Sequence, residues 1–415
     1  MTKNELIKIK NRLLWQLGYK PLKEKKEESI ITTVKKSIRT RKSRELEAEI
    51  ENIMFECKLF NSSGEYACHI NTDKKSDNHF ITMWKLPRGL NYKNYIEKQQ
   101  VFSDNLTAFV NIESRKGLLK IEVVKGLIPE KVLYNFNYED YKDKYVLPVP
   151  VGFSNGKQLF IWDLIKVIHV LICGETGGGK TTLCMCWIDA LLQNPYVKIF
   201  CIDLALKSFF YTRNHTIFAG DLNGAQKILI YLMLEMERRK KILTQFGSLD
   251  VVKFNKRNPE NMLPYLILFV DEFAFTSPKI NFESKEVQNL CKQLQAYTIK
   301  LSSLARSLGI HLVIGMQKPS KDLIPKEAKD NFPGRISFKT GDQGHSMSIL
   351  GNTKAFYLPD IQGRMIAQYR NSYEIQGMLI DDETAEKRIR DLCNRKDDGF
   401  VSERDENKEK GLLPR

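Results

Sequence analysis

The residues best suited to chemistry form a glycine-rich run that ends in a lysine and two threonines. They are, in order, Gly174, Glu175, Thr176, Gly177, Gly178, Gly179, Lys180, Thr181 and Thr182. In the pattern GxxxxGK[ST], the glycines let backbone N–H groups curl around the β- and γ-phosphates of a nucleotide, the lysine neutralises charge and the following hydroxyl ligates Mg²⁺. The run therefore predicts an ATP site in which Lys180 contacts phosphate and Thr181 binds magnesium.

Two adjacent acids end an apolar run about 90 residues later. Asp271 and Glu272 directly follow residues 266–270, which are all apolar. At the end of a strand beside a phosphate site, the first acid can hold a magnesium-bound water and the second can polarise the water that attacks the γ-phosphate. We therefore predict that Asp271 is a metal residue and that Glu272 is a catalytic one.

Two further polar residues end apolar runs, and each leaves two interpretations open. Gln317 follows the run 310–314, where a polar side chain can sense the γ-phosphate or lie in a turn. Asp203 ends the run 197–202, where an acid can serve the site or cap a helix or turn. Spacing alone does not separate these interpretations.

The elements that would position these residues follow an α/β pattern. Short, nearly continuous apolar runs are typical of buried parallel strands, and helical segments separate them here. The predicted strands are 167–173, 197–202, 265–270 and 310–314, and the predicted helices are 183–193, 222–247 and 283–308. This alternation predicts an α/β domain with a mainly parallel sheet, whose ligand lies at the carboxyl ends of the strands.

The remaining segments predict smaller parts. Residues 1–50, with 14 basic and 7 acidic side chains, are predicted to form a basic helical arm. This arm is either a solvated helix or a contact for nucleic acid, acidic lipid or a membrane-bound partner. Residues 51–144 favour a small α+β domain, 145–380 hold the motifs, and 381–415 favour a charged helix and tail.

The composition favours an anionic partner. The 415 residues carry 65 Lys and Arg against 50 Asp and Glu, a formal net charge of +15, which is typical of proteins that bind nucleic acid or membrane surfaces. No run reaches the roughly 18 apolar residues of a membrane-spanning helix, and the first residues lack a secretory signal. The eight cysteines have neither CxxC nor zinc-finger spacing. We therefore expect a soluble cytoplasmic protein.

Several stretches resemble the FtsK/SpoIIIE motor ATPases of the HerA-FtsK group, and most of all the FtsK-like coupling proteins of conjugative plasmids and integrative elements. The stretches are 147–152, 169–182, 235–239, 270–274, 304–320 and 333–338, with a weaker match at 86–89. The longest of them, 304–320, reads Leu-Ala-Arg-Ser-Leu-Gly-Ile-His-Leu-Val-Ile-Gly-Met-Gln-Lys-Pro-Ser. Their order along the chain is that of the family.

The resemblance implies a RecA-like P-loop motor domain over residues 145–380, in a homohexameric ring that pumps DNA through its channel with ATP and Mg²⁺. It implies that Gln317 is the γ-phosphate sensor. It also implies that Arg335 is a catalytic arginine offered to the ATP of the neighbouring subunit, where it stabilises transition-state charge. Arg306 and Arg364 are rival candidates for that role.

The sequence also departs from the family pattern. It has none of the usual membrane-spanning segments, and no winged-helix module follows residue 380, which argues against oriented chromosome pumping. Lys318 stands where relatives often have arginine.

Our leading hypothesis is a DNA translocase that serves the coupling or transfer of a mobile genetic element. It would bind DNA without sequence specificity, and a relaxase or a membrane-bound transfer protein would be its partner and recruit it to the membrane. The alternatives are a nucleotide-switched adaptor that recruits a relaxase or a secretion channel, and a replication or packaging helicase.

Overall fold

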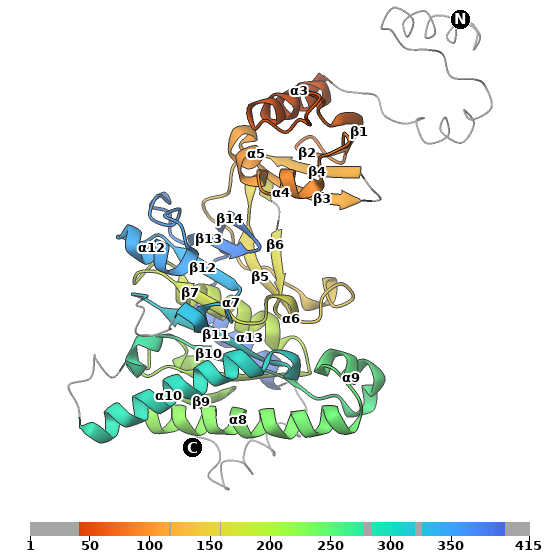
Figure 1. Cartoon of the computed structure of the whole chain (residues 1–415). Helices are drawn as coiled ribbons and strands as arrows, with labels where there is room; N and C mark the ends of the chain where they lie inside the picture. The colour runs from red at the N-terminus through yellow and green to blue at the C-terminus, as the bar shows by residue number, and fades with distance from the viewer. Residues whose placement is uncertain (1–40, 116–117, 158, 278–283, 320–325, 395–415) are drawn as a thin grey trace, which may run out of the picture. The chain divides into compact units, whose positions relative to one another are not determined.

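The computed structural model describes residues 41–115, 118–157, 159–277, 284–319 and 326–394 (Figure 1). Most of the predicted basic arm, residues 1–40, and the tail predicted from residue 395 lie outside these ranges. The described residues form two compact units, one up to Leu106 with Val110–Val123, and one of Thr107–Phe109 with the residues from Val124 onward.

The first unit is built around a four-stranded sheet of order β1-β2-β4-β3. Its elements are α3 (Arg41–Glu56), β1 (Cys68–Lys74), β2 (His79–Lys85), α4 (Tyr92–Ile96), α5 (Gln99–Leu106), β3 (Ala108–Arg115) and β4 (Leu118–Lys125), the last two of which reach the unit boundary. Helix α3 buries Leu46, Ile50 and Met54, which recur every four residues on one face. The boundary predicted at residue 50 therefore falls inside a helix.

The second unit contains a ten-stranded sheet of order β6-β5-β14-β13-β12-β7-β11-β10-β8-β9. Its strands are β5 (Pro148–Phe153), β6 (Leu159–Asp163), β7 (Val170–Cys173), β8 (Val197–Ile202), β9 (Ile217–Ala219), β10 (Tyr265–Val270), β11 (Ile310–Met316), β12 (Gly334–Phe338), β13 (Arg364–Tyr369) and β14 (Asn371–Gln376). Neighbours from β12 to β9 pair in parallel, and those from β12 to β6 pair antiparallel. The four predicted strands are β7, β8, β10 and β11, all in the parallel half.

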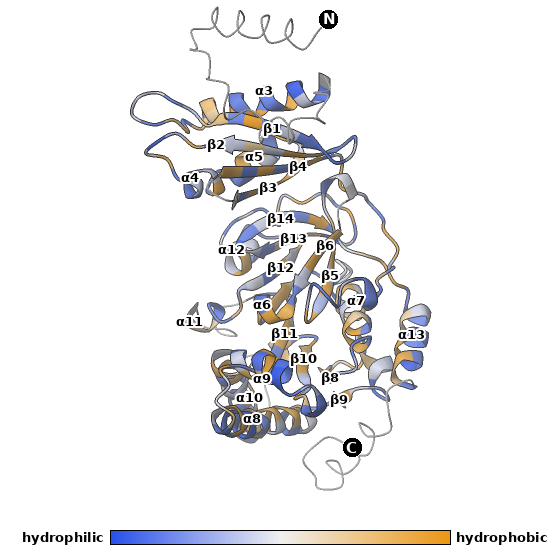
Figure 2. Cartoon of the chain, turned by 90° about the vertical axis from the view of Figure 1, so that its right-hand side faces the viewer, coloured by the Kyte–Doolittle hydropathy of each residue, from blue (hydrophilic) through white to orange (hydrophobic). Residues whose placement is uncertain are grey.

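Helices cover both sides of the parallel strands. They are α6 (Leu164–Val167), α7 (Lys180–Leu192), α8 (Leu222–Gln245), α9 (Val251–Arg257), α10 (Lys285–Leu304), α11 (Lys326–Lys329), α12 (Gln343–Leu350) and α13 (Asp382–Asn394). Figure 2 shows α8 and α10 on one side of the strands and α7 and α13 on the other. This layering buries β7, β8, β10 and β11, which explains their nearly continuous apolar runs. No helix within the described ranges is both long and apolar enough to cross a membrane.

Candidate nucleotide-binding site

The glycine-rich loop joins β7 to α7 at the carboxyl ends of the parallel strands. Gly177 and Gly179 have φ angles of 84° and 114°, which L side chains rarely adopt. Gly179 is also the residue before α7 and offers no side-chain cap, so the first N–H groups of the helix are open to an anion. This conformation is that of a phosphate-binding loop.

Residues from strands far along the chain support the loop. The backbone N–H of Gly363 donates to the carbonyl of Gly178 at 3.0 Å, and the Gln362 amide donates to the carbonyl of Gly177 at 3.3 Å. Phe338 lies beneath, because a Cβ added at Gly174 would come within 2.8 Å of the Phe338 Cβ atom. Phe338 ends the family-like stretch 333–338, whereas Gln362 belongs to no motif that the sequence analysis recognised.

Arg364 holds this supporting segment in place. Its guanidinium donates to Gln376 Oε1 at 3.0 Å and to Glu374 Oε1 at 2.7 Å, and the Gln376 amide donates to the carbonyl of Gln362 at 2.8 Å. The side chain of Arg364 is buried. A rival for the arginine offered to a neighbour is therefore fully engaged within its own chain.

The structure brings Lys180, Glu272 and Gln317 together. Lys180 Nζ lies 3.4 Å from Glu272 Oε2, and both side chains are almost fully buried. The same oxygen accepts the backbone N–H of Gln317 at 2.8 Å, and Glu272 Oε1 accepts the N–H of Ala274 at 3.2 Å. Gln317 therefore meets the catalytic acid through its backbone, while its side chain is exposed.

Thr181 and Asp271 meet through a residue that the sequence analysis missed. The hydroxyl oxygens of Thr181 and Ser208 lie 3.1 Å apart, and Ser208 is also close enough to the Asp271 carboxyl group to lower its pKa. Burial raises the pKa of Asp271, as does the charge of Asp203, while Lys180 and Ser208 oppose this shift. Ser208 lies in an irregular loop, where no spacing rule indicates it.

The oxygen atoms of Thr181 and Asp271 suit a magnesium ion. Among the described residues, no group of three or more His, Cys, Asp or Glu side chains could hold a metal by itself. Magnesium commonly binds through one or two carboxylates together with substrate phosphates and water, so this donor set fits an ion that arrives with a nucleotide.

The two other arginines lie at the opposite edge of the sheet, before β11 and at the start of β12. The Arg335 guanidinium donates to the carbonyls of Phe332, Ile349 and Lys329 at 3.2–3.3 Å. Arg306 is exposed, and within the described ranges its side chain makes no hydrogen bond or ion pair. It borders a cavity of about 300 Å³.

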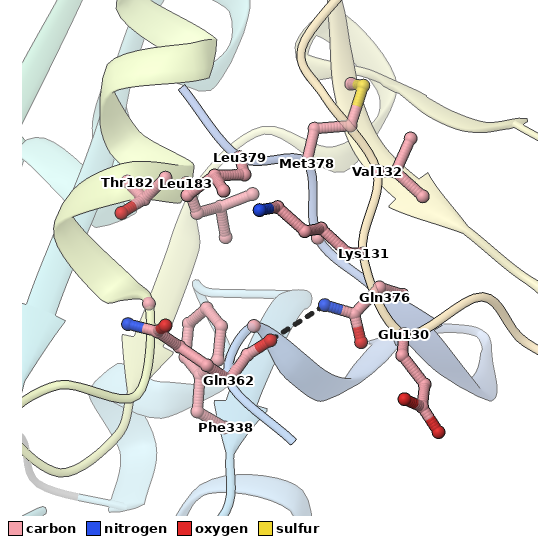
Figure 3. Close-up of a pocket in the computed structure, with 13 residues that line it drawn as sticks. Glu130, Lys131, Val132, Thr182, Leu183, Phe338, Gln362, Gln376, Met378 and Leu379 are labelled. Carbon is pink, nitrogen blue, oxygen red and sulfur yellow. Dashed lines mark hydrogen bonds between the residues drawn. The ribbon is translucent and has the colours of Figure 1, made fainter. Parts of the chain in front are cut away.

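A second cavity, of about 210 Å³, opens beside the phosphate loop (Figure 3). Its lining residues are Glu130, Lys131, Val132, Gly179, Thr182, Leu183, Phe338, Gln362, Gly363, Gln376, Gly377, Met378 and Leu379. In Figure 3, the side chains of Thr182 and Leu183 on α7 lie across from Val132 and Met378. The cavity thus combines apolar walls with a few polar groups, as small-molecule sites do.

Residues 137–321 match the model of the FtsK/SpoIIIE family. The chain carries an FtsK/SpoIIIE domain. The DNA translocase FtsK of Borreliella burgdorferi is 32% identical over 229 residues, which cover 52% of this chain and 28% of that protein. The DNA translocase FtsK of Chlamydia muridarum is 28% identical over 293 residues, 64% of this chain and 35% of that protein. The matches thus span about a third of these curated relatives.

Solved structures with the same fold include two that cover the FtsK/SpoIIIE domain. The pCW3 conjugation coupling protein TcpA, in its monomer form with ATPγS, matches 84% of this chain and 99% of that chain with a TM-score of 0.59 and 23% identity. EssC ATPases 2 and 3 from Geobacillus thermodenitrificans match 65% of this chain and 51% of that chain, with a TM-score of 0.54 and 18% identity. At these identities the likeness establishes the fold.

The predicted resemblance and the predicted RecA-like P-loop ATPase fold are confirmed. The geometry of the FtsK/SpoIIIE domain brings the predicted phosphate loop, Asp271, Glu272 and the Gln317 backbone to one edge of the sheet. Arg335 lies at the other edge of the sheet. The roles of these residues in catalysis stay predictions.

Proposed function

We propose that the protein is an ATP-driven DNA translocase in which the site at the carboxyl edge hydrolyses ATP with Mg²⁺. The observation that carries the proposal is the contact of Lys180 and the Gln317 backbone with the same carboxylate oxygen of Glu272. These contacts join three parts of an ATPase site: the cation that would bind phosphate, Lys180, the acid that would activate water, Glu272, and the end of β11 that would sense hydrolysis.

ATP binding follows from the geometry of the loop. The phosphates would lie against the N–H groups at the start of α7 and attract Lys180 away from Glu272, since the existing contact of 3.4 Å is weak. The base would enter the cavity beside Thr182 and Leu183. Thr181 and Asp271 would hold the magnesium ion, which offsets charge on the phosphates when bound.

Hydrolysis then depends on Glu272. Once Lys180 has moved to phosphate, Glu272 stays oriented by the N–H groups of Gln317 and Ala274 and can accept the proton of the attacking water. The backbone N–H of Gln317 holds the Glu272 carboxylate directly. A shift of the end of β11 after the γ-phosphate departs would therefore also move Glu272. This contact supports the sensor role of Gln317.

A ring would place the other sheet edge of one subunit against the ATP of the next, because a head-to-tail interface joins different faces. We predicted Arg335 for the trans role, but its guanidinium already serves three carbonyls of its own chain. Arg306 is exposed, and none of its five donors is used by another residue within the described ranges. The geometry therefore favours Arg306, and Arg306→Ala should abolish the stimulation of turnover by assembly while Arg335→Ala should retain part of it.

DNA is the proposed cargo, and it would be held through its phosphates without reading of sequence. The net charge of +15 supports this, as does the name DNA translocase FtsK of the relatives. The name of TcpA, a conjugation coupling protein, supports a role in transfer of a mobile element. The hexameric ring remains part of the proposal and follows from the family resemblance. In that role a relaxase or a membrane-bound transfer protein would recruit the cytoplasmic motor.

The test is the ATPase rate measured against protein concentration, with and without duplex and single-stranded DNA, for the wild type and Glu272→Gln. We expect turnover that rises with concentration and with DNA, and that is lost in the variant. DNA-indifferent turnover together with no DNA binding at low salt would overturn the translocase and favour the adaptor. Strand displacement on forked DNA would instead favour the helicase.

A further inference from the structure

The loop after β8 lies beside the end of the strand that carries Asp271. Strands β8 and β10 are parallel neighbours, and the Asp271 N–H donates to the carbonyl of Ile202 at 3.0 Å. Asp203 is the next residue on β8, so two carboxylates follow adjacent strand ends. Their mutual repulsion is unfavourable in a buried setting unless a positive charge offsets it.

Asp203 is only half satisfied. Its Oδ2 atom accepts the backbone N–H groups of Lys207 and Phe209 at 3.0 and 2.8 Å. Its Oδ1 atom is buried and has no hydrogen-bond partner among the described residues, in a residue with 1% of its surface exposed. A turn cap needs only the first oxygen. Burying a carboxylate oxygen without a partner costs free energy, so the unpaired Oδ1 atom of Asp203 suggests a partner that arrives with a ligand.

Ser208 connects this acid to the nucleotide site. The two N–H groups that Asp203 accepts flank Ser208, and they fix the backbone on both of its sides. The Ser208 hydroxyl lies 3.1 Å from Thr181 Oγ1 and is close enough to the Asp271 carboxyl group to lower its pKa. One small side chain therefore joins both of the oxygen donors that suit magnesium.

We propose that Ser208 and Asp203 complete the magnesium site. Ser208 is a positioning residue that holds Thr181 and Asp271 at the spacing the ion requires. Asp203 fixes Ser208 through Oδ2, and its charge and its free Oδ1 oxygen attract the hydrated ion. This inference rests on the proposed function, because it concerns the same Mg²⁺–ATP site.

The competing explanation is that Asp203 only shapes its turn. The substitution Asp203→Asn separates the two, since an asparagine oxygen still accepts both N–H groups but carries no charge. Ser208→Ala removes the hydroxyl, and Ser208→Thr restores it. Ser248→Ala is the matched control, because Ser248 Oγ donates only to a backbone carbonyl, that of Asp250, in the same unit.

The experiment measures binding of the fluorescent nucleotide mant-ATP to the full chain, first in EDTA and then across a MgCl₂ titration. In EDTA we expect all variants to bind alike. The Mg²⁺ concentration for half-maximal gain in affinity should rise about tenfold in Asp203→Asn and Ser208→Ala, as for other residues that orient metal ligands, and stay at the wild-type value in Ser208→Thr and Ser248→Ala.

An unchanged Mg²⁺ requirement in Asp203→Asn and Ser208→Ala would overturn the inference and leave the proposed function standing. A wild type that fails to bind mant-ATP with or without Mg²⁺ would instead overturn the proposed function. If thermal melting shows that Asp203→Asn is unfolded, the Mg²⁺ requirements of Ser208→Ala and Ser208→Thr alone decide whether the inference holds.

Discussion

Two buried cation–carboxylate pairs lie at opposite edges of the large sheet and differ in how fully they are bonded. At the amino edge, Arg239 donates to Glu235 at 2.7 Å and to the carbonyls of Leu308 and Pro264 at 2.7 and 2.8 Å. At the carboxyl edge, the one polar contact of the Lys180 ammonium group among the described residues is that with Glu272, at 3.4 Å.

The difference separates a structural pair from one that awaits a ligand. Arg239 is fully buried and spreads its bonds over the starts of β10 and β11, so it fixes α8 against the sheet. Lys180 is nearly as buried but keeps donor capacity that no protein group in contact uses well. A buried cation with unused donors is energetically costly alone and is therefore stabilised by an incoming anion.

The largest expected effect comes from Glu272→Gln at the carboxyl edge. Turnover should fall by about 10³-fold, because the amide cannot accept the proton of the attacking water, while mant-ATP affinity changes little. Steady-state phosphate release and equilibrium binding measure the two quantities. A turnover within tenfold of the wild type would remove Glu272 from the chemistry.

The next effect contrasts the two cations directly through Arg239→Met and Lys180→Met. Arg239→Met should lower the free energy of unfolding by about 3–5 kcal/mol, because two carbonyls lose their buried donor and Glu235 keeps only the half-exposed Arg238. Lys180→Met should lower it by less than about 1 kcal/mol, because Glu272 keeps two backbone N–H groups. Urea denaturation of both variants checks this. Equal losses would mean that the two pairs do not differ in kind.

A smaller effect separates Arg335 from Arg306, the two amino-edge candidates for the arginine offered to a neighbouring subunit. Arg335→Ala should cost about 1–3 kcal/mol of unfolding free energy, since three carbonyls lose a donor. Arg306→Ala should change it by less than about 0.5 kcal/mol, as for exposed positions. The same denaturation series gives both values. A large loss in Arg306→Ala would show that this arginine is structural.

The smallest effect concerns two histidines buried near the amino edge. Burial lowers the pKa of His169 to about 3 and that of His311 to about 4. The unfolded chain binds these protons near pH 6.5 and the folded chain does not, so stability is full above pH 6.5 and falls as the pH drops toward 4. Between pH 6.5 and 5.5 the loss should be about 1 kcal/mol per histidine.

Denaturation midpoints across this pH range measure the loss. His311→Asn should halve the dependence of stability on pH, because it removes one of the two titrating groups. Asparagine is chosen because its amide can still donate to the carbonyl of Ile168, which His311 Nδ1 contacts at 2.8 Å. A slope that His311→Asn leaves unchanged would show that other groups cause it.

The parallel half of the sheet could be predicted, because strands that are buried on both faces consist almost entirely of apolar residues, as β7, β8, β10 and β11 do. The antiparallel half could not. Strand β5 contains Pro148 and Pro150, and β14 is only partly buried over Asn371–Glu374, so neither has the pattern of a core strand. The residues that support the phosphate loop, such as Gln362 and Gln376, come from this half.

By itself, the sequence determined the phosphate loop, the two acids after β10 and the family. These features are local, because the backbone angles at Gly177 and Gly179 and the strand that delivers Asp271 and Glu272 depend on adjacent residues. Only the tertiary structure decided which oxygen of Glu272 accepts the Gln317 N–H and that the Arg335 guanidinium is hydrogen-bonded to carbonyls of its own chain. It also decided that Ser208 lies beside Thr181 at the metal-binding residues. Those contacts depend on the order of strands in the sheet, and no spacing along the chain encodes which strand ends become neighbours.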